Sequence, residues 1–81
     1  MIRVLFFAQL REQLGCDGLE LAAQAANLAE LREHLCGEHP QWREALSRSS
    51  VLMAVNQQLV KANHPLADGD EVAFFPPVTG G

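Results

Sequence analysis

The chain closes with Glu71-Val72-Ala73-Phe74-Phe75-Pro76-Pro77-Val78-Thr79-Gly80-Gly81. Apolar alternation over residues 71–75 predicts a final strand with Val72 and Phe74 on one face. Pro76 and Pro77 end that strand, because a proline has no amide donor and fixes its φ angle. We therefore expect a sheet-based domain over residues 1–75 and a flexible, protruding tail over residues 76–81.

The tail holds the first candidate for chemistry. Gly80 and Gly81 carry no Cβ, so this part of the chain is thin and pliable enough to thread a narrow cleft. The terminal carboxylate of Gly81 is then the best candidate for the working group, and Gly80 and Thr79 are expected to thread the cleft with it. The alternative is an ordinary frayed terminus, which is what most chain ends are.

Composition bounds the class of protein. A chain of 81 residues has room for one modest core, and 48% hydrophobic with 20% charged residues is ordinary for a soluble globular domain. No apolar run approaches the roughly 20 residues of a membrane span, and no secretion signal precedes the first strand, so we expect a cytoplasmic protein. The net charge is −4 and the basic residues are scattered, which argues against nucleic-acid binding.

Cys16 and Cys36 are expected to be unpaired thiols.

The remaining strands follow from alternation and turn signals. The apolar residues of segment 2–8 alternate, with Ile2, Val4, Phe6 and Ala8 expected on one face. Further strands are expected at residues 19–23, 51–55 and 58–60, with Asn56 and Gln57 forming the tight turn between the last two.

One main helix is expected in the middle of the chain. Asn27 followed by Glu30 resembles a capping box, a leucine stripe follows, and Gly37 stands where a helix commonly ends. Pro40 opens a second, short helix that runs to residue 46, with Trp42, Ala45 and Leu46 on its apolar side. The order of elements predicts an α+β fold in which the main helix packs on one face of the sheet.

The other face of the sheet is expected to be partly open. Alternation leaves Phe7 and Phe75 opposite the core-facing residues, and Leu59 is a candidate third member of the same patch. Large exposed apolar groups that cluster together indicate a partner-binding surface. The alternative is that the second short helix or a loop covers them.

Three segments carry a family resemblance: residues 2–9, Ile-Arg-Val-Leu-Phe-Phe-Ala-Gln; residues 54–57, Ala-Val-Asn-Gln; and residues 64–81, from His-Pro-Leu-Ala-Asp-Gly-Asp to the diglycine end. In this combination the chain resembles the small subunits of molybdopterin synthase, the MoaD family of ubiquitin-like sulfur carriers. The resemblance implies a ubiquitin-like β-grasp fold with a mixed sheet. It also implies that Gly81 is the reacting residue.

The resemblance implies a reaction sequence and its partners. A MoeB-like adenylating enzyme uses ATP and Mg²⁺ to activate the carboxylate of Gly81, and sulfur then converts it to a thiocarboxylate. That sulfur passes to cyclic pyranopterin monophosphate in a MoaE-like large subunit, within a heterotetramer of two small and two large subunits. The chain itself is expected to bind no cofactor and not to be an enzyme alone, with the catalytic groups on the large subunit.

The sequence also contains features that suggest other functions. His34, Cys36 and His39 are close in sequence, but a fourth metal ligand is not evident and a metal site is not expected. A sulfur carrier of the thiamine pathway and a ubiquitin-like protein modifier share the diglycine end. The Phe-Phe-Pro-Pro segment and the whole-chain likeness favour the molybdopterin pathway.

Overall fold

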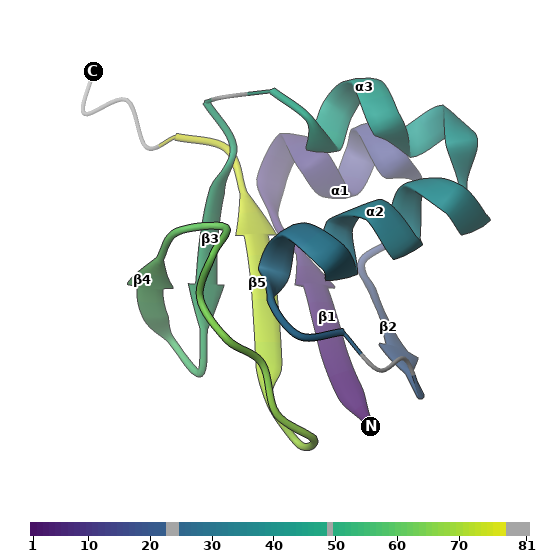
Figure 1. Ribbon diagram of the computed structural model, residues 1–81. Coiled ribbons are helices and arrows are strands. Elements are labelled where there is room, and N and C mark those ends of the chain that lie inside the picture. Colours follow the sequence, from purple (N-terminus) through teal and green to yellow (C-terminus); the bar gives the residue numbers. More distant parts are fainter. Residues whose placement is uncertain (23–24, 49, 78–81) are drawn as a thin grey trace.

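The computed structural model describes residues 1–22, 25–48 and 50–77, and within them five strands form one mixed sheet. The strands are β1 (Ile2–Phe6), β2 (Gly18–Leu21), β3 (Leu52–Val55), β4 (Gln58–Val60) and β5 (Glu71–Phe75). Their order across the sheet is β2-β1-β5-β3-β4 (Figure 1). The two central strands, β1 and β5, are parallel, and the other neighbours are antiparallel. The first and last strands of the chain thus lie side by side at the centre.

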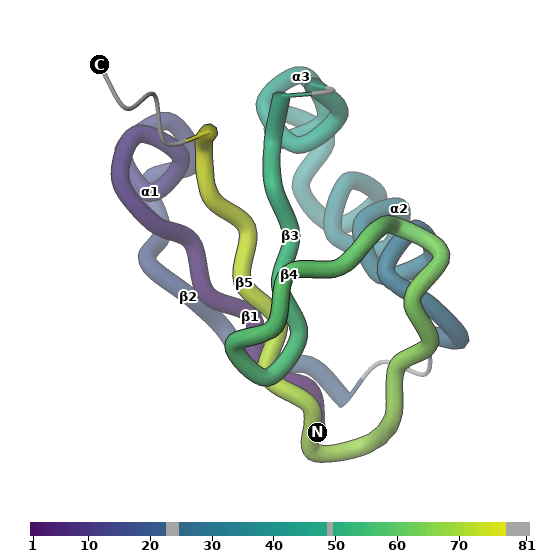
Figure 2. The backbone as a smooth tube through the Cα atoms, turned by 90° about the vertical axis from the view of Figure 1, so that its left-hand side faces the viewer, coloured from purple at the N-terminus to yellow at the C-terminus, as the bar shows by residue number. Residues whose placement is uncertain are grey.

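The helices are unequally distributed about this sheet. Helix α2 (Leu28–Glu38) and helix α3 (Arg43–Leu46), which follows a 3₁₀ turn η1 (Pro40–Trp42), lie on one side (Figure 2). Helix α1 (Ala8–Leu14) lies at the end of the sheet where β1 and β5 finish (Figures 1 and 2). No helix of the described residues is long and apolar enough to cross a membrane. The α+β class and the β-grasp arrangement, with α2 as the main helix on one face, are confirmed.

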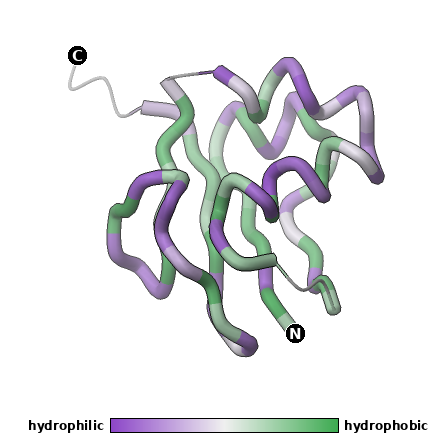
Figure 3. Tube along the Cα trace, in the orientation of Figure 1, coloured by the Kyte–Doolittle hydropathy of each residue, from purple (hydrophilic) through white to green (hydrophobic). Residues whose placement is uncertain are grey.

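The core lies between the sheet and the helices. Figure 3 shows hydrophobic residues along the central strands and mostly hydrophilic ones on the outer turns of the helices. Phe6 lies within the core, stacked on Phe74 at 5.9 Å between ring centroids and edge-on to Trp42 at 5.3 Å. Burial of such aromatic side chains supplies a large share of the hydrophobic stabilisation. The other core residues are Ile2, Val4, Leu10, Leu14, Leu28, Leu31, Leu35, Cys36, Leu46, Val55 and Val72.

The short second helix has the apolar side that was predicted. Trp42 and Leu46 are buried, and Ala45 packs against the core. The indole Nε1–H of Trp42 donates to the carbonyl oxygen of Leu14 at 3.1 Å. This bond satisfies the polar atom of a buried tryptophan and joins η1 to the end of α1.

The start of α2 is as predicted, but its end is not. The backbone N–H of Glu30 donates to Oδ1 of the capping residue Asn27 at 2.9 Å. Gly37 was expected to end the helix, yet it lies inside α2 and does not adopt a left-handed backbone. The chain passes instead directly into η1: the N–H of His39 bonds to Leu35 and the N–H of Trp42 bonds to His39. No glycine is needed for this exit, because these backbone bonds supply the turn.

The prediction of a strand through Ala8 is wrong. Strand β1 ends at Phe6, and Ala8 begins α1 with a left-handed backbone of φ +53°. The sequence signal that could have revealed α1 is the pair Leu10 and Leu14, spaced for one helix face, followed by Gly15 in the left-handed conformation of a C-terminal cap. Strand β2 is also shorter than the predicted 19–23, because it ends at Leu21; Ala23 lies outside the described residues.

The two hairpin strands and the last strand are confirmed. Asn56 and Gln57 have φ angles of +51° and +69°, as expected for the two-residue turn that suits a twisted hairpin. The Asn56 side chain also binds the segment before β5: its Nδ2 donates to Asp70 Oδ1 at 3.0 Å, and its Oδ1 accepts from the backbone N–H of Glu71 at 3.0 Å. One turn residue thus fixes where β5 starts relative to β3.

Candidate functional site

The last strand ends at the predicted residue. Strand β5 ends at Phe75, followed by a half-buried Pro76 and an exposed Pro77. Thr79, Gly80 and Gly81, the residues predicted to thread a cleft and to react, lie outside the described residues. Their assignment stays a prediction from the sequence. The structure describes the surface from which the tail emerges.

The face of the sheet away from α2 carries a continuous apolar row. Residues directly paired across neighbouring strands point to the same face. The register pairs Leu5 with Ala73, Ala73 with Ala54 and Ala54 with Leu59, so the row crosses β1, β5, β3 and β4. Ala54 is only 8% exposed although it is not part of the main core cluster, which indicates that its neighbours on this face cover it.

The three predicted patch residues belong to this face. Phe7 is 45% exposed, Leu59 is 63% exposed and Phe75 is half-buried, whereas Phe74, one residue earlier, is 0% exposed. Phe75 pairs with Leu52 of β3, and the N–H of Phe7 donates to the carbonyl of Phe74 at 3.2 Å. Phe7 and Phe75 therefore come together where the central strands end. We call the whole set the open-face band: Leu5, Phe7, Leu52, Ala54, Leu59, Ala73 and Phe75.

The members of the band are not equally close to one another. Leu59 lies at the β4 edge, two strands from Ala73, and is joined to the aromatic end of the band through Ala54 and Leu52. The exposure of Phe7 and Leu59 shows that neither the short helix nor a described loop covers them. That alternative is wrong for these two residues.

A polar row borders the band on the side opposite the tail. The register pairs Arg3 with Glu20 of β2 and with Glu71 of β5, and the Arg3 guanidinium lies 3.7 Å from the Glu20 carboxylate. Both side chains of this ion pair are exposed, so it adds little stability. The band is therefore bordered on this side by charged side chains, and a polar rim beside an apolar centre is common in protein–protein interfaces.

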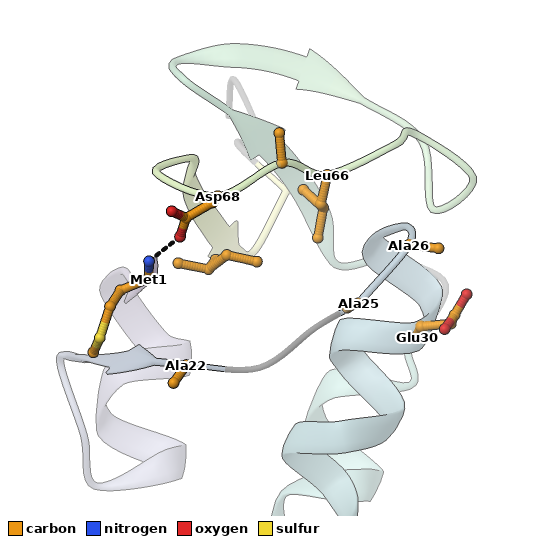
Figure 4. Close-up of a pocket in the computed structure, with 9 residues that line it drawn as sticks. Met1, Ala22, Ala25, Ala26, Glu30, Leu66 and Asp68 are labelled. Carbon is orange, nitrogen blue, oxygen red and sulfur yellow. Dashed lines mark hydrogen bonds and ion pairs between the residues drawn. The ribbon is translucent and has the colours of Figure 1, made fainter.

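A separate hollow of about 760 Å³ lies beside the start of β1, at the end of the sheet away from Phe75, and Figure 4 shows its lining residues. Its charged groups are the Met1 amine, Asp68 and Glu30; the amine pairs with Asp68, which lowers the pKa of that carboxyl. The other lining residues are Ile2, Ala22, Ala25, Ala26, Leu66 and Ala67. The hollow places no histidine or cysteine among its described lining residues, and we assign it no chemistry.

The thiols and histidines occupy separate places. Cys16 donates its S–H to the carbonyl of Gly18 at 3.3 Å, and both cysteines are free. Cys36 is buried, and this burial raises the pKa of its thiol. His34 lies 3.8 Å from Glu38, while the His39 ring stacks on Trp42 with centroids 3.8 Å apart. Among residues 1–22, 25–48 and 50–77, no three potential ligands of the His, Cys, Asp or Glu type are grouped to hold a metal.

Comparison with known proteins identifies the family. The sequence model of the ThiS family matches residues 4–81. The chain belongs to the ThiS family. Two curated relatives, both named molybdopterin synthase sulfur carrier subunit, match this ThiS-family chain. In each comparison the match covers the whole of this chain and the whole of the relative. The one from Escherichia coli is 56% identical and the one from Haemophilus influenzae is 46% identical.

Solved structures place this ThiS-family chain in the same fold. SAMP1 from Haloferax volcanii superposes with a TM-score of 0.83 at 25% identity, covering 99% of this chain and 98% of that one. A putative molybdopterin converting factor subunit 1 from Pyrococcus furiosus gives 0.78 at 30% identity, covering 95% and 97%. A complex of subunits 1 and 2 of the molybdopterin-converting factor from Helicobacter pylori gives 0.69 at 32% identity, covering 99% and 97%. The ubiquitin-like β-grasp fold is thereby confirmed.

Proposed function

We propose that this chain is the sulfur carrier subunit of a molybdopterin synthase and that Gly81 carries the sulfur as a C-terminal thiocarboxylate. The observation that carries the proposal is the 56% identity with the Escherichia coli sulfur carrier subunit over the full length of both chains. A match of this extent includes both the sheet surface and the tail. The structure adds a surface suited to a protein partner beside the root of that tail.

The chemistry requires activation of Gly81 because a carboxylate resists nucleophilic attack. A MoeB-like enzyme, with ATP and Mg²⁺, joins the carboxylate oxygen to AMP and releases pyrophosphate. Hydrosulfide, supplied by the sulfur donor, then attacks the carbonyl carbon, AMP and a proton leave, and Gly81 becomes a thiocarboxylate. This sulfur is transferred to cyclic pyranopterin monophosphate to build the dithiolene of molybdopterin, and Gly81 returns to a carboxylate. Because each product contains two such sulfurs, two carriers loaded with sulfur are required.

The catalytic acid and base come from the large subunit in this proposal. A groove beside the tail root is lined by residues of α1, α3 and the segment that precedes β3, and its described polar side chains are Gln9, Gln13, Arg48 and Ser50. Amide, hydroxyl and guanidinium side chains are poor general acids and bases near neutral pH. General acid–base groups must lie within hydrogen-bond reach of the reacting atoms. The composition of the groove supports a carrier that presents its tail to a partner's catalytic groups.

Docking uses the open-face band. Phe7 and Phe75 are its largest side chains and Leu59 is its most exposed one, and aromatic anchors commonly dominate interface energies. The large MoaE-like subunit, in a heterotetramer of two small and two large subunits, and the MoeB-like enzyme are the proposed partners. The Helicobacter pylori complex of the two converting-factor subunits supports the first of them. The identities with sulfur carrier subunits favour this function over a thiamine-pathway carrier or a protein modifier.

The test is sulfur loading followed by transfer. The purified chain is incubated with a MoeB-like enzyme, ATP, Mg²⁺ and a sulfur donor, and intact mass spectrometry follows the exchange of one oxygen for sulfur at Gly81. The loaded chain should then convert cyclic pyranopterin monophosphate when the large subunit is added. A variant lacking Gly81, or one extended by a single residue, should remain folded but should not be adenylated. Product formation by either variant would overturn the mechanism.

A further inference from the structure

Ala8 has a backbone conformation that an L-residue adopts at a cost. Its φ angle of +53° lies in the left-handed region, where the Cβ of alanine crowds the backbone. Such a residue persists only where the surrounding structure determines it, and strained positions of this kind gather at functional sites. Ala8 is exposed, so packing of its own methyl group in the core does not explain the conformation.

The conformation of Ala8 fixes the residue before it. Phe7 has an extended backbone, and its N–H donates to Phe74 of β5 at 3.2 Å. Its carbonyl accepts from the N–H groups of Leu10 at 3.1 Å and Arg11 at 3.4 Å. The two peptide groups of Phe7 are thus held by two different elements. This is possible only because the chain reverses at Ala8.

The second element is itself anchored. Leu10 and Leu14 are buried in the core, so α1 cannot drift relative to the sheet. A chain that continued as a strand would carry residue 8 onward beside β5 and would leave the carbonyl of Phe7 without these α1 donors. The reversal at Ala8 instead ends the strand with the Phe7 side chain on the open-face band.

We infer that the left-handed backbone of Ala8 is a positioning element that holds the Phe7 side chain in its docking orientation before a partner binds. The inference rests on the proposed function, since it assigns Phe7 to the docking surface. A side chain ordered in advance loses less conformational entropy on binding. Ala8 therefore contributes to affinity without needing to touch the partner.

The test compares two substitutions that both accept a left-handed backbone. Ala8→Gly removes the crowding at Cβ but lets the backbone adopt both positive and negative φ angles. Ala8→Asn also tolerates the left-handed region, but its side chain still restricts the other backbone conformations. Binding to the purified large subunit of molybdopterin synthase is measured by calorimetry. We expect Ala8→Gly to weaken binding about twofold to tenfold, and we expect Ala8→Asn to keep the affinity of the parent.

Thermal melts and a double mutant separate positioning from folding. The Ala8→Gly variant should melt within about 4 °C of the parent, since relief of strain and the added chain entropy of glycine offset each other. In a Phe7→Ala background, Ala8→Gly should cause no further loss of affinity, because no ring remains to be positioned. Ala29→Gly in the first turn of α2 is the matched control and should leave the affinity unchanged.

Each outcome decides the matter. Parental affinity in Ala8→Gly, an equal loss in Ala8→Asn, or a further loss in the Phe7→Ala background overturns the positioning role. Parental affinity in Phe7→Ala alone overturns the docking surface on which the inference rests. A Phe7→Ala variant that binds weakly beside an Ala8→Gly variant that binds normally leaves the docking surface intact and removes only the role of Ala8.

Discussion

Asn56 and Asp70 are joined side chain to side chain, with Asn56 Nδ2 lying 3.0 Å from Asp70 Oδ1. The other oxygen of the same carboxylate accepts from the backbone N–H of Ala67 at 2.8 Å. Asn56 bonds in addition to the backbone N–H of Glu71 and has a left-handed φ angle of +51°. The β3–β4 turn and the turn before β5 are therefore one bonded unit.

We expect Asn56→Ala to destabilise the fold by about 2 kcal/mol, because it removes two hydrogen bonds and places alanine at a positive φ angle. Asn56→Gly loses the same bonds but suits the backbone, so it should be destabilised less. Urea unfolding of the two variants and the parent measures both differences. Equal stability of the Asn56→Ala variant and the parent would show that the side-chain bonds contribute nothing.

Phe74 and Phe75 should separate folding from docking. Phe74 is fully buried, and Phe74→Ala should leave a cavity that costs about 3–5 kcal/mol of stability. Phe75 faces the open side, and Phe75→Ala should weaken binding to both proposed partners by ~2 kcal/mol with a much smaller effect on melting. Calorimetric titrations and thermal melts on the same two variants provide the comparison. If Phe75→Ala binds normally and melts as early as Phe74→Ala, the two faces have been assigned the wrong way round.

Gly80→Val tests the prediction that the tail threads a narrow cleft in its partner. A β-branched side chain at this position should obstruct entry, so sulfur transfer should fall strongly. Thermal stability should stay close to that of the parent, because the core residues within the described part of the chain all lie before Pro76. The rate of sulfur transfer from the preloaded carrier to the precursor is the measurement. An unchanged rate would mean that the cleft is wide enough for a valine.

Two glycines should respond to alanine in opposite directions. Gly37 lies in α2 with open space where a Cβ would stand, so Gly37→Ala should stabilise the fold by about 0.5–1 kcal/mol. At Gly18 a Cβ would stand 2.8 Å from the Val4 carbonyl oxygen and 3.0 Å from Leu5 Cδ2. Gly18→Ala should therefore be destabilising. Chemical unfolding of both variants decides it, and a stabilised Gly18→Ala would contradict the close approach of β2 to β1.

Stability should fall at alkaline pH because of Cys36. Burial raises the pKa of this thiol, with smaller opposing effects from neighbouring charges, so the folded state keeps the proton at a pH where the unfolded state has lost it. The contribution is complete below the ordinary thiol pKa of ~8.5 and is lost as the pH rises above it. The free energy of unfolding is measured across this range. The Cys36→Ala variant should be less stable than the parent at every pH, but its free energy of unfolding should fall less steeply as the pH rises. An equally steep fall in the variant would mean that groups other than Cys36 cause the alkaline loss of stability.

Much of the local structure could be predicted because it depends on near neighbours. Alternation placed Val72 and Phe74 on the core face of the last strand, and both are fully buried. The Asn27 cap and the Asn56–Gln57 turn require only side chains and backbone angles within a few residues. The diglycine end singles out the carboxylate of Gly81 as a candidate reacting group, whereas the carrier role comes from the family resemblance. Alternation, helix caps and tight turns depend on neighbouring residues, so they can be predicted before the fold is known.

The tertiary structure decided what the local pattern could not. The run Phe6-Phe7-Ala8 reads as a continuing strand, but burial of Leu10 and Leu14 and the bonds from Phe7 to both β5 and α1 favour a reversal at Ala8. The open-face band likewise unites Leu5, Ala73 and Leu59, which become neighbours only through the register of β1, β5, β3 and β4. Sequence periodicity determines which residues face together along one strand. Only pairing between distant strands, chosen by burial of the shared core, determines which of those faces join into one surface.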